Sequence, residues 1–82
     1  MLLFLRDYIF IEDGNDDGSI DFAIRNDTHK YILFENGNEA FFNLSSDPLE
    51  SINLLNINRL PLSASNSIIK DELTSKLVEI IN

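Results

Sequence analysis

The run from Phe41 to Leu55 constrains the fold of this chain most, because its residue types predict a fixed order of local structures. Asp47 can accept hydrogen bonds from the free backbone N–H groups of a helical turn. Pro48 suits the first helical position because it has no N–H, and Glu50 stands where a capping box would close. The run therefore predicts a rigid corner between the end of a strand and a helical turn.

Four segments before the corner have the patterns of strands. Residues 2–11 are almost continuously apolar, which is typical of a buried strand. Residues 20–25 alternate apolar and polar side chains, which places one face of that segment on a core. Residues 30–34 and 40–44 complete the set, and the Asn36-Gly37 pair between them predicts a tight type I′ hairpin. The acidic segment from Glu12 to Ser19 is expected to be a loop.

The period of the apolar pattern changes from Ser67 onward. Its stripe is Ile69, Leu73, Leu77 and Ile80, with Ile68 and Ile81 widening it. The candidate helix caps are Ser63, Ser65 and Asn66, and Glu72 with Lys76 is a supportive pair four residues apart. An amphipathic helix can cover one face of an antiparallel sheet. We therefore expect an α+β fold, a four-stranded antiparallel sheet with a C-terminal amphipathic helix packed on one face, in one small domain spanning 1–82.

Composition excludes several classes of function. The 82 residues carry a formal net charge of −8, which disfavours nucleic acid and anionic membranes because both need clustered Lys and Arg. The chain has no Cys, so disulfides, thiolate catalysis and thiolate zinc sites are absent. Its one His, His29, has no second His or Cys with which to bind a transition metal, and we expect it on the surface.

The order of two motifs resembles the last part of the sulfatases. Arg25 is followed five residues later by Lys30-Tyr31, and the corner reads Asp47-Pro48-x-Glu50-x-x-Asn53-Leu54. About sixty residues, from 20 to 81, follow that pattern. The resemblance implies a small C-terminal subdomain, an antiparallel sheet with a helix, beside a large catalytic domain.

The catalytic motif of sulfatases is not present here. The family uses Cys or Ser in Cys/Ser-x-Pro-Ser-Arg, whereas Ser46-Asp47-Pro48 continues with Leu49 and Glu50. The resemblance therefore implies a non-catalytic fragment or subdomain that completes a sulfuric ester hydrolase, without turnover or a cofactor of its own. A parent enzyme could bind calcium and be periplasmic or extracellular, although nothing in the chain itself fixes its location.

The residues that could carry a site each have a structural explanation as well. Arg25 and Lys30 could reach a sulfate from the edge of a neighbouring active site, or could only solvate a strand. Asp47, Pro48, Glu50 and Asn53 are expected to cap the corner. The calcium candidates Asp13, Asn15, Asp17 and Asp21 fit part of an EF-hand loop, but Ile24 replaces its bidentate Glu, so any site would be weak.

Aromatic residues are too numerous for one face of a small sheet to bury. Seven of the eight aromatic residues lie between positions 8 and 42: Tyr8, Phe10, Phe22, Tyr31, Phe34, Phe41 and Phe42. We expect part of them on a second sheet face that lies against a sulfatase catalytic domain or causes self-association. The alternatives are an independent acidic protein-interaction module and a weak calcium-binding domain.

Overall fold

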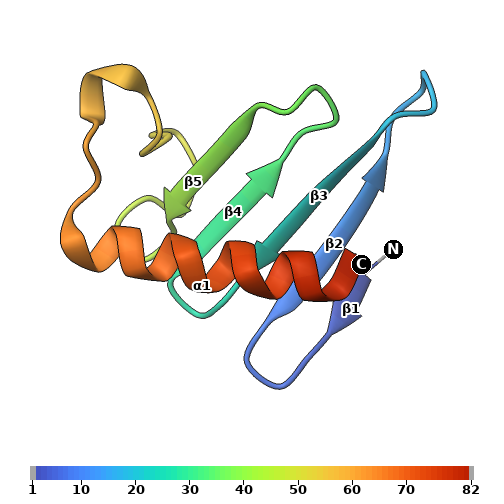
Figure 1. Ribbon diagram of the computed structural model, residues 1–82, viewed down its shortest axis with the longest axis horizontal. Helices are drawn as coiled ribbons and strands as arrows, with labels where there is room; N and C mark the ends of the chain where they lie inside the picture. The colour runs from blue at the N-terminus through green and yellow to red at the C-terminus, as the bar shows by residue number, and fades with distance from the viewer. Residues whose placement is uncertain (1, 82) are drawn as a thin grey trace.

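The computed structural model describes residues 2–81, so the two ends of the predicted domain, 1 and 82, lie outside the described residues. A five-stranded antiparallel sheet in the order β1-β2-β3-β4-β5 carries one long helix across one face (Figure 1). The strands are β1 (Leu2–Phe4), β2 (Ile9–Gly14), β3 (Ile20–Arg25), β4 (His29–Leu33) and β5 (Glu39–Asn43). A 3-10 helix (Ile57–Arg59) precedes the helix α1 (Ala64–Ile81). The α+β class, the antiparallel sheet and the C-terminal helix are thereby confirmed.

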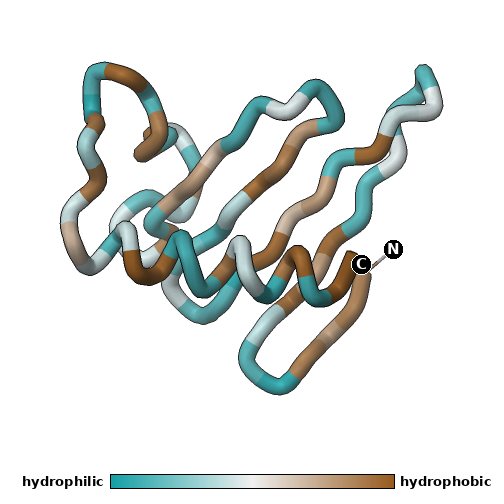
Figure 2. Tube along the Cα trace, in the orientation of Figure 1, coloured by the Kyte–Doolittle hydropathy of each residue, from teal (hydrophilic) through white to brown (hydrophobic). Residues whose placement is uncertain are grey.

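The number of strands was predicted one too low. Residues 2–11 form two strands and not one, because the chain reverses between Leu5 and Tyr8, where the Leu5 N–H donates to the Tyr8 carbonyl at 2.8 Å. Arg6 and Asp7 lie exposed at this turn, and Figure 2 shows it as a polar tip between two apolar arms. A charged pair is costly to bury without partners, so the reversal keeps both charges in water.

The two long hairpins turn in the same way. The Gly18 N–H donates to the Asn15 carbonyl at 3.0 Å, and the Gly37 N–H donates to the Phe34 carbonyl at 2.9 Å. Both glycines have φ of 89°, the left-handed region that favours glycine. Asn36 does not share a positive φ, so the predicted type I′ turn is wrong. A type I turn followed by a left-handed glycine joins the strands instead.

The core lies between the sheet and α1. Its buried members are Phe10, Ile24, Tyr31, Phe41, Leu73 and Leu77, and Tyr8, Phe22, Leu33, Ile69 and Ile80 pack around them. The four residues of the predicted helix stripe all belong to this core. Ile68 and Ile81 do not widen it, because their side chains are 60% and 38% exposed.

Helix α1 begins three residues before the predicted start at Ser67. The Ser63 hydroxyl accepts a hydrogen bond from the Asn66 N–H at 3.2 Å, which identifies Ser63 as the cap. The expected pair between Glu72 and Lys76 is replaced by an ion pair from Lys76 to Glu79, with 3.7 Å between nitrogen and oxygen.

Candidate functional site

The corner after β5 is held by the carboxylate of Asp47. Its oxygens accept hydrogen bonds from the Ser51 N–H at 3.0 Å, the Ser51 hydroxyl at 2.8 Å and the Ile52 N–H at 2.8 Å. The two backbone bonds and then the hydroxyl hold the pKa of Asp47 below its ordinary value. Residues 44–56 form turns and no helix, so the predicted helical turn after Pro48 is wrong. Asp47 reaches donors four and five residues ahead, which closes a wider loop than a helix cap does.

Glu50 ties this corner to the sheet. Its backbone has φ of 55°, and its Oε1 lies 3.0 Å from the Nζ of Lys30 on β4. The carboxylate therefore pairs across the chain and does not close a capping box. Lys30 follows His29 and precedes the buried Tyr31, so it lies on the face of the sheet opposite α1. The corner thus folds over that face.

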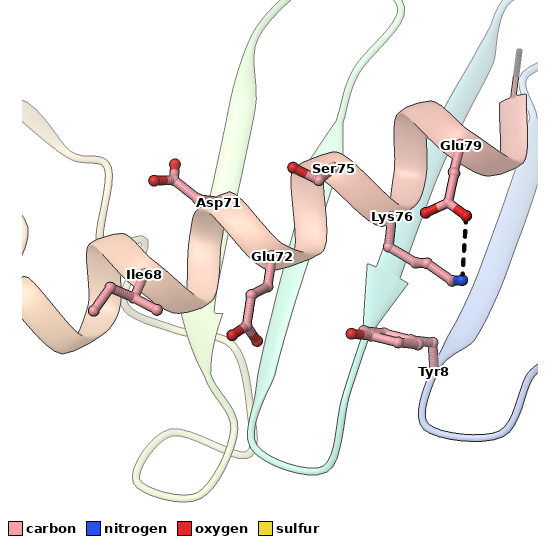
Figure 3. Close-up of a pocket in the computed structure, with 7 residues that line it drawn as sticks. All are labelled: Tyr8, Ile68, Asp71, Glu72, Ser75, Lys76 and Glu79. Carbon is pink, nitrogen blue, oxygen red and sulfur yellow. Dashed lines mark ion pairs between the residues drawn. The ribbon is translucent and has the colours of Figure 1, made fainter.

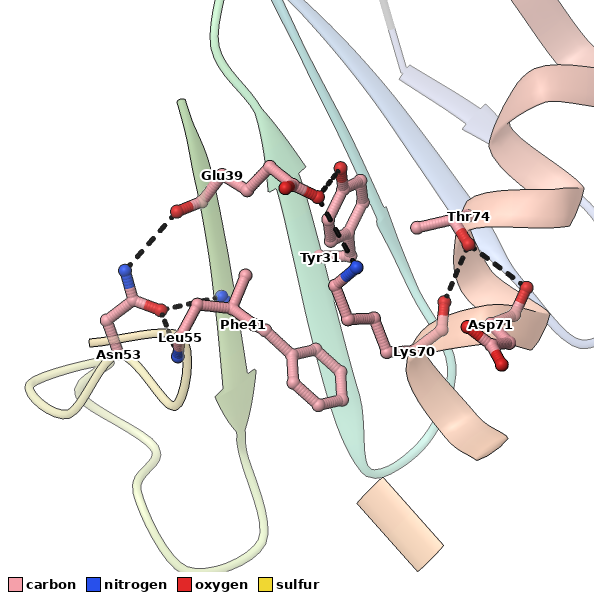
Figure 4. A network of polar contacts seen from close by, with 8 residues as sticks. All are labelled: Tyr31, Glu39, Phe41, Asn53, Leu55, Lys70, Asp71 and Thr74. Atoms are coloured by element: carbon pink, nitrogen blue, oxygen red, sulfur yellow. Dashed lines mark hydrogen bonds and ion pairs between the residues drawn. The ribbon is translucent and has the colours of Figure 1, made fainter. Parts of the chain in front are cut away.

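Asn53 closes the outer edge of β5. Its Oδ1 accepts hydrogen bonds from the Phe41 N–H and the Leu55 N–H, both at 3.0 Å (Figure 4). The next residue, Leu54, donates its N–H to the Phe41 carbonyl at 2.9 Å. Both outward backbone groups of Phe41 are therefore satisfied by the corner. In the part of the chain that the structure describes, no strand pairs with the outer edge of β1.

The face of the sheet opposite α1, which we call the open face, is apolar at its centre. From β1 to β4 it consists of Leu2, Phe4, Ile9, Ile11, Asp13, Asp21, Ala23, Arg25, Lys30 and Ile32. Leu2 and Phe4 are 54% and 69% exposed. Ala23 at the centre of this face is buried among its neighbours, and so are Ala40 and Phe42 on β5, beside the strand that Glu50 contacts. Most of the aromatic residues lie under α1, so the open face is more aliphatic than the sequence predicted.

Charges on the open face are arranged in rows of opposite sign. Arg25 stands opposite Lys30 in the β3–β4 register, so the structure brings these two candidates together. Asp13 stands opposite Asp21, which lies four residues before Arg25 on β3. The Arg25 Nε donates to the Asn26 carbonyl at 3.1 Å, and among residues 2–81 its guanidinium makes no ion pair. The apolar row of Ile11, Ala23 and Ile32 separates the two charged rows.

The four calcium candidates Asp13, Asn15, Asp17 and Asp21 lie on the β2–β3 hairpin, and the side chains of Asn15 and Asp17 form hydrogen bonds within its turn. Asp17 accepts hydrogen bonds from the hydroxyl and N–H of Ser19, at 2.6 and 2.9 Å, which lower its pKa. Asp21 accepts from the Glu35 N–H at 3.0 Å, linking the hairpin to the β4–β5 turn. Within the described residues, no group of three or more His, Asp or Glu side chains could hold a metal ion.

A buried tyrosine and two charged residues form a network that sequence reasoning missed. The Tyr31 hydroxyl donates to Glu39 Oε2 at 2.5 Å, and the Lys70 Nζ lies 3.4 Å from the same oxygen (Figure 4). Burial, and then the bond to Glu39, raise the pKa of Tyr31 well above its ordinary value. The hydrogen bond from Tyr31 lowers the pKa of Glu39, and Lys70 adds to that effect. The network fastens α1 to β4 and β5.

His29 is buried, so its predicted surface position is wrong. Its ring stacks on Phe41 with 5.3 Å between centroids, and both ring nitrogens have partners. Nδ1 lies 2.7 Å from the Thr28 hydroxyl, and Nε2 lies 3.1 Å from Oδ1 of Asn66 in α1. The imidazole therefore joins the start of β4 to the start of the helix, and no free nitrogen is left for chemistry.

A hollow lies beside the outer side of α1. It has a volume of about 540 Å³ and is lined by Tyr8, Ile68, Asp71, Glu72, Ser75, Lys76 and Glu79 (Figure 3). The Lys76 Nζ lies 5.7 Å from the centroid of the Tyr8 ring and pairs with Glu79. The remaining carboxylates are exposed on the helix, as expected of a solvated helical face.

Comparisons of the chain with models of protein families, with curated proteins and with solved structures found no match. Among the described residues, no helix combines the length and the apolar character needed to cross a membrane.

Proposed function

We propose that this chain is a non-catalytic module that completes a larger sulfatase-like hydrolase by docking its open face on the catalytic domain. The observation that carries the proposal is the contrast between the two faces of the sheet. Helix α1 covers one face, whereas the other leaves Ile9, Ile11 and Ile32 only partly buried, next to the exposed Leu2 and Phe4. A contiguous apolar patch on a small domain marks a surface that a partner covers.

The segments that carry the resemblance also contact one another, which supports the proposal. Lys30 of the first motif pairs with Glu50 of the second, and Asn53 of the second bonds to β5. The two motifs therefore build one substructure, the corner folded over the sheet. Each motif supplies one side of the contact, which gives a physical reason for the two motifs to occur together.

The experiment mixes the purified chain with a sulfatase-like catalytic domain from the same source organism, truncated before its own C-terminal sheet. We expect the chain to raise the unfolding temperature of that domain and the turnover of a chromogenic sulfate ester. The variant Ile11→Arg, on the open face, should lose both effects. Ile68→Arg places the same charge on the exposed side of α1 and should keep them.

Two results would contradict the proposal. One is an unchanged catalytic domain when the chain is present in excess. The other is ester turnover by the chain alone that survives repurification, since the proposal gives it no nucleophile. Binding that Ile68→Arg abolishes and Ile11→Arg spares would favour the alternative, an acidic interaction module that uses the outer side of α1.

A further inference from the structure

Strand β3 carries opposite charges at equal distances from its centre on the open face. Asp21 and Arg25 lie two residues to either side of Ala23, and all three side chains share that face. We propose that two copies of the chain pack open face to open face about a two-fold axis that runs across the strands above Ala23. The occupant of the open face, when the chain is separate from a catalytic domain, is thus a second copy.

The direction of the axis follows from the charges. An axis parallel to the strands would lay Arg25 over Arg25 and Asp21 over Asp21 of the other copy. An axis across the strands reverses their direction, so Arg25 lies over Asp21 of the other copy, and symmetry repeats the pair. The row of Ile11, Ala23 and Ile32 then packs on itself at the centre of the contact. This arrangement is the aligned packing of two sheets.

The Arg25 guanidinium and the Asp21 carboxylate each have hydrogen-bonding capacity left for a second copy. Within residues 2–81, the Arg25 guanidinium has only the bond from Nε to the Asn26 carbonyl. Asp21 accepts the Glu35 N–H through Oδ1, which leaves Oδ2 for another donor. The net charge of −8 on each copy opposes association, but exposed charges are screened beyond about 8 Å at physiological salt. Contacts between the charged rows act at shorter range.

The size of the open face sets the strength of the contact. Four strands about 4.8 Å apart, each presenting about five residues of about 3.3 Å, give a footprint of roughly 320 Å². Standard interfaces bury about 800 Å² on each partner, so we expect a weak dimer, populated at concentrations of about 100 µM and above. The dimer uses the same face that the proposed function assigns to the catalytic domain.

Sedimentation equilibrium of the whole chain, from about 10 to 500 µM, tests the proposal with charge reversals. Arg25→Glu and Asp21→Lys should each weaken the dimer about tenfold or more, and the double variant should restore it. Asp21→Lys is the sharper test, because it lowers the net negative charge and would strengthen a dimer limited only by repulsion. Asp21→Asn keeps an acceptor for the Glu35 N–H and should also weaken the dimer, so it serves if the lysine variant does not fold. Arg59→Glu and Glu72→Lys make the same charge changes at exposed sites off the open face and should have no such effect.

A wild-type chain that stays monomeric at the highest concentration overturns the dimer. So does a dimer that neither Arg25→Glu nor any Asp21 variant weakens, or that the double variant fails to restore. Neither outcome contradicts the proposed function, because that function is tested by adding the chain to a catalytic domain and by the variant Ile11→Arg. Conversely, loss of the catalytic-domain effect leaves a charge-dependent dimer standing as a property of the chain alone.

Discussion

Replacing Leu73 by Ala should remove a large part of the stability of the fold. The Leu73 side chain is 0% exposed and belongs to the cluster that joins α1 to the sheet. Leu→Ala at such a site costs about 2–5 kcal/mol, because the apolar contact is lost and a cavity remains. A chain of 82 residues has a free energy of unfolding of only about 4–12 kcal/mol. At mid-range values, a loss of about 3.5 from about 8 kcal/mol, the variant should retain little more than half of the wild-type stability.

The measurement is guanidinium denaturation followed by far-ultraviolet circular dichroism. Leu and Ala both have high helix propensity, so the difference in the free energy of unfolding reports on packing and not on helix propensity. Val78→Ala on the exposed side of α1, where the side chain is 52% exposed, is the matched control and should change stability by less than about 0.5 kcal/mol. Equal losses in the two variants would refute the placement of Leu73 in the core.

Three further outcomes follow from the polar contacts and turns. The pKa of Glu39 is lowered in the folded state, so the stability that its carboxylate contributes is present above the unfolded pKa and is lost as the pH falls through the folded pKa. The wild-type chain should therefore unfold at a higher temperature than Glu39→Gln near pH 7, and this difference should shrink below pH 4.5. Gly37→Ala should cost about 1 kcal/mol in denaturant unfolding because of its φ of 89°, whereas Gly14→Ala, with equally open space and no positive φ, should be neutral or stabilising; equal effects would contradict the turn geometry. Asp47→Ala should lower the thermal midpoint by releasing three hydrogen bonds, and an unchanged midpoint would show that they do not hold the corner.

Local patterns in the sequence predicted the elements whose side chains repeat with a clear period. The alternation in residues 20–25 and the stripe of α1 depend only on which face meets the core, so both could be recognised. The apolar run of residues 2–11 has no such contrast, and the one signal of its turn was the pair Arg6-Asp7. The signals at Asp47-Pro48 suit a helix start and a wider loop equally well.

The polar network could not be predicted because its members meet only through tertiary structure. The register of the β4–β5 hairpin brings Tyr31 and Glu39 together, and the expected type I′ turn did not predict that register. Lys70 joins them from α1. His29 was misplaced for the same reason, since its partner Asn66 is 37 residues away. The candidates Arg25 and Lys30, in contrast, flank a short turn, so antiparallel pairing around that turn keeps them close together.

The closed edge at β5 limits how this protein can polymerise. A sheet that exposes two free edges can add copies without end, which is a route to fibres. Here Asn53 and Leu54 occupy the outward backbone groups of Phe41, whereas the three-residue β1 leaves the opposite edge unpaired within the described chain. Two copies could therefore pair through their β1 strands, and the pair would then expose only the two covered β5 edges. By covering the β5 edge, the corner limits edge-to-edge association to two copies.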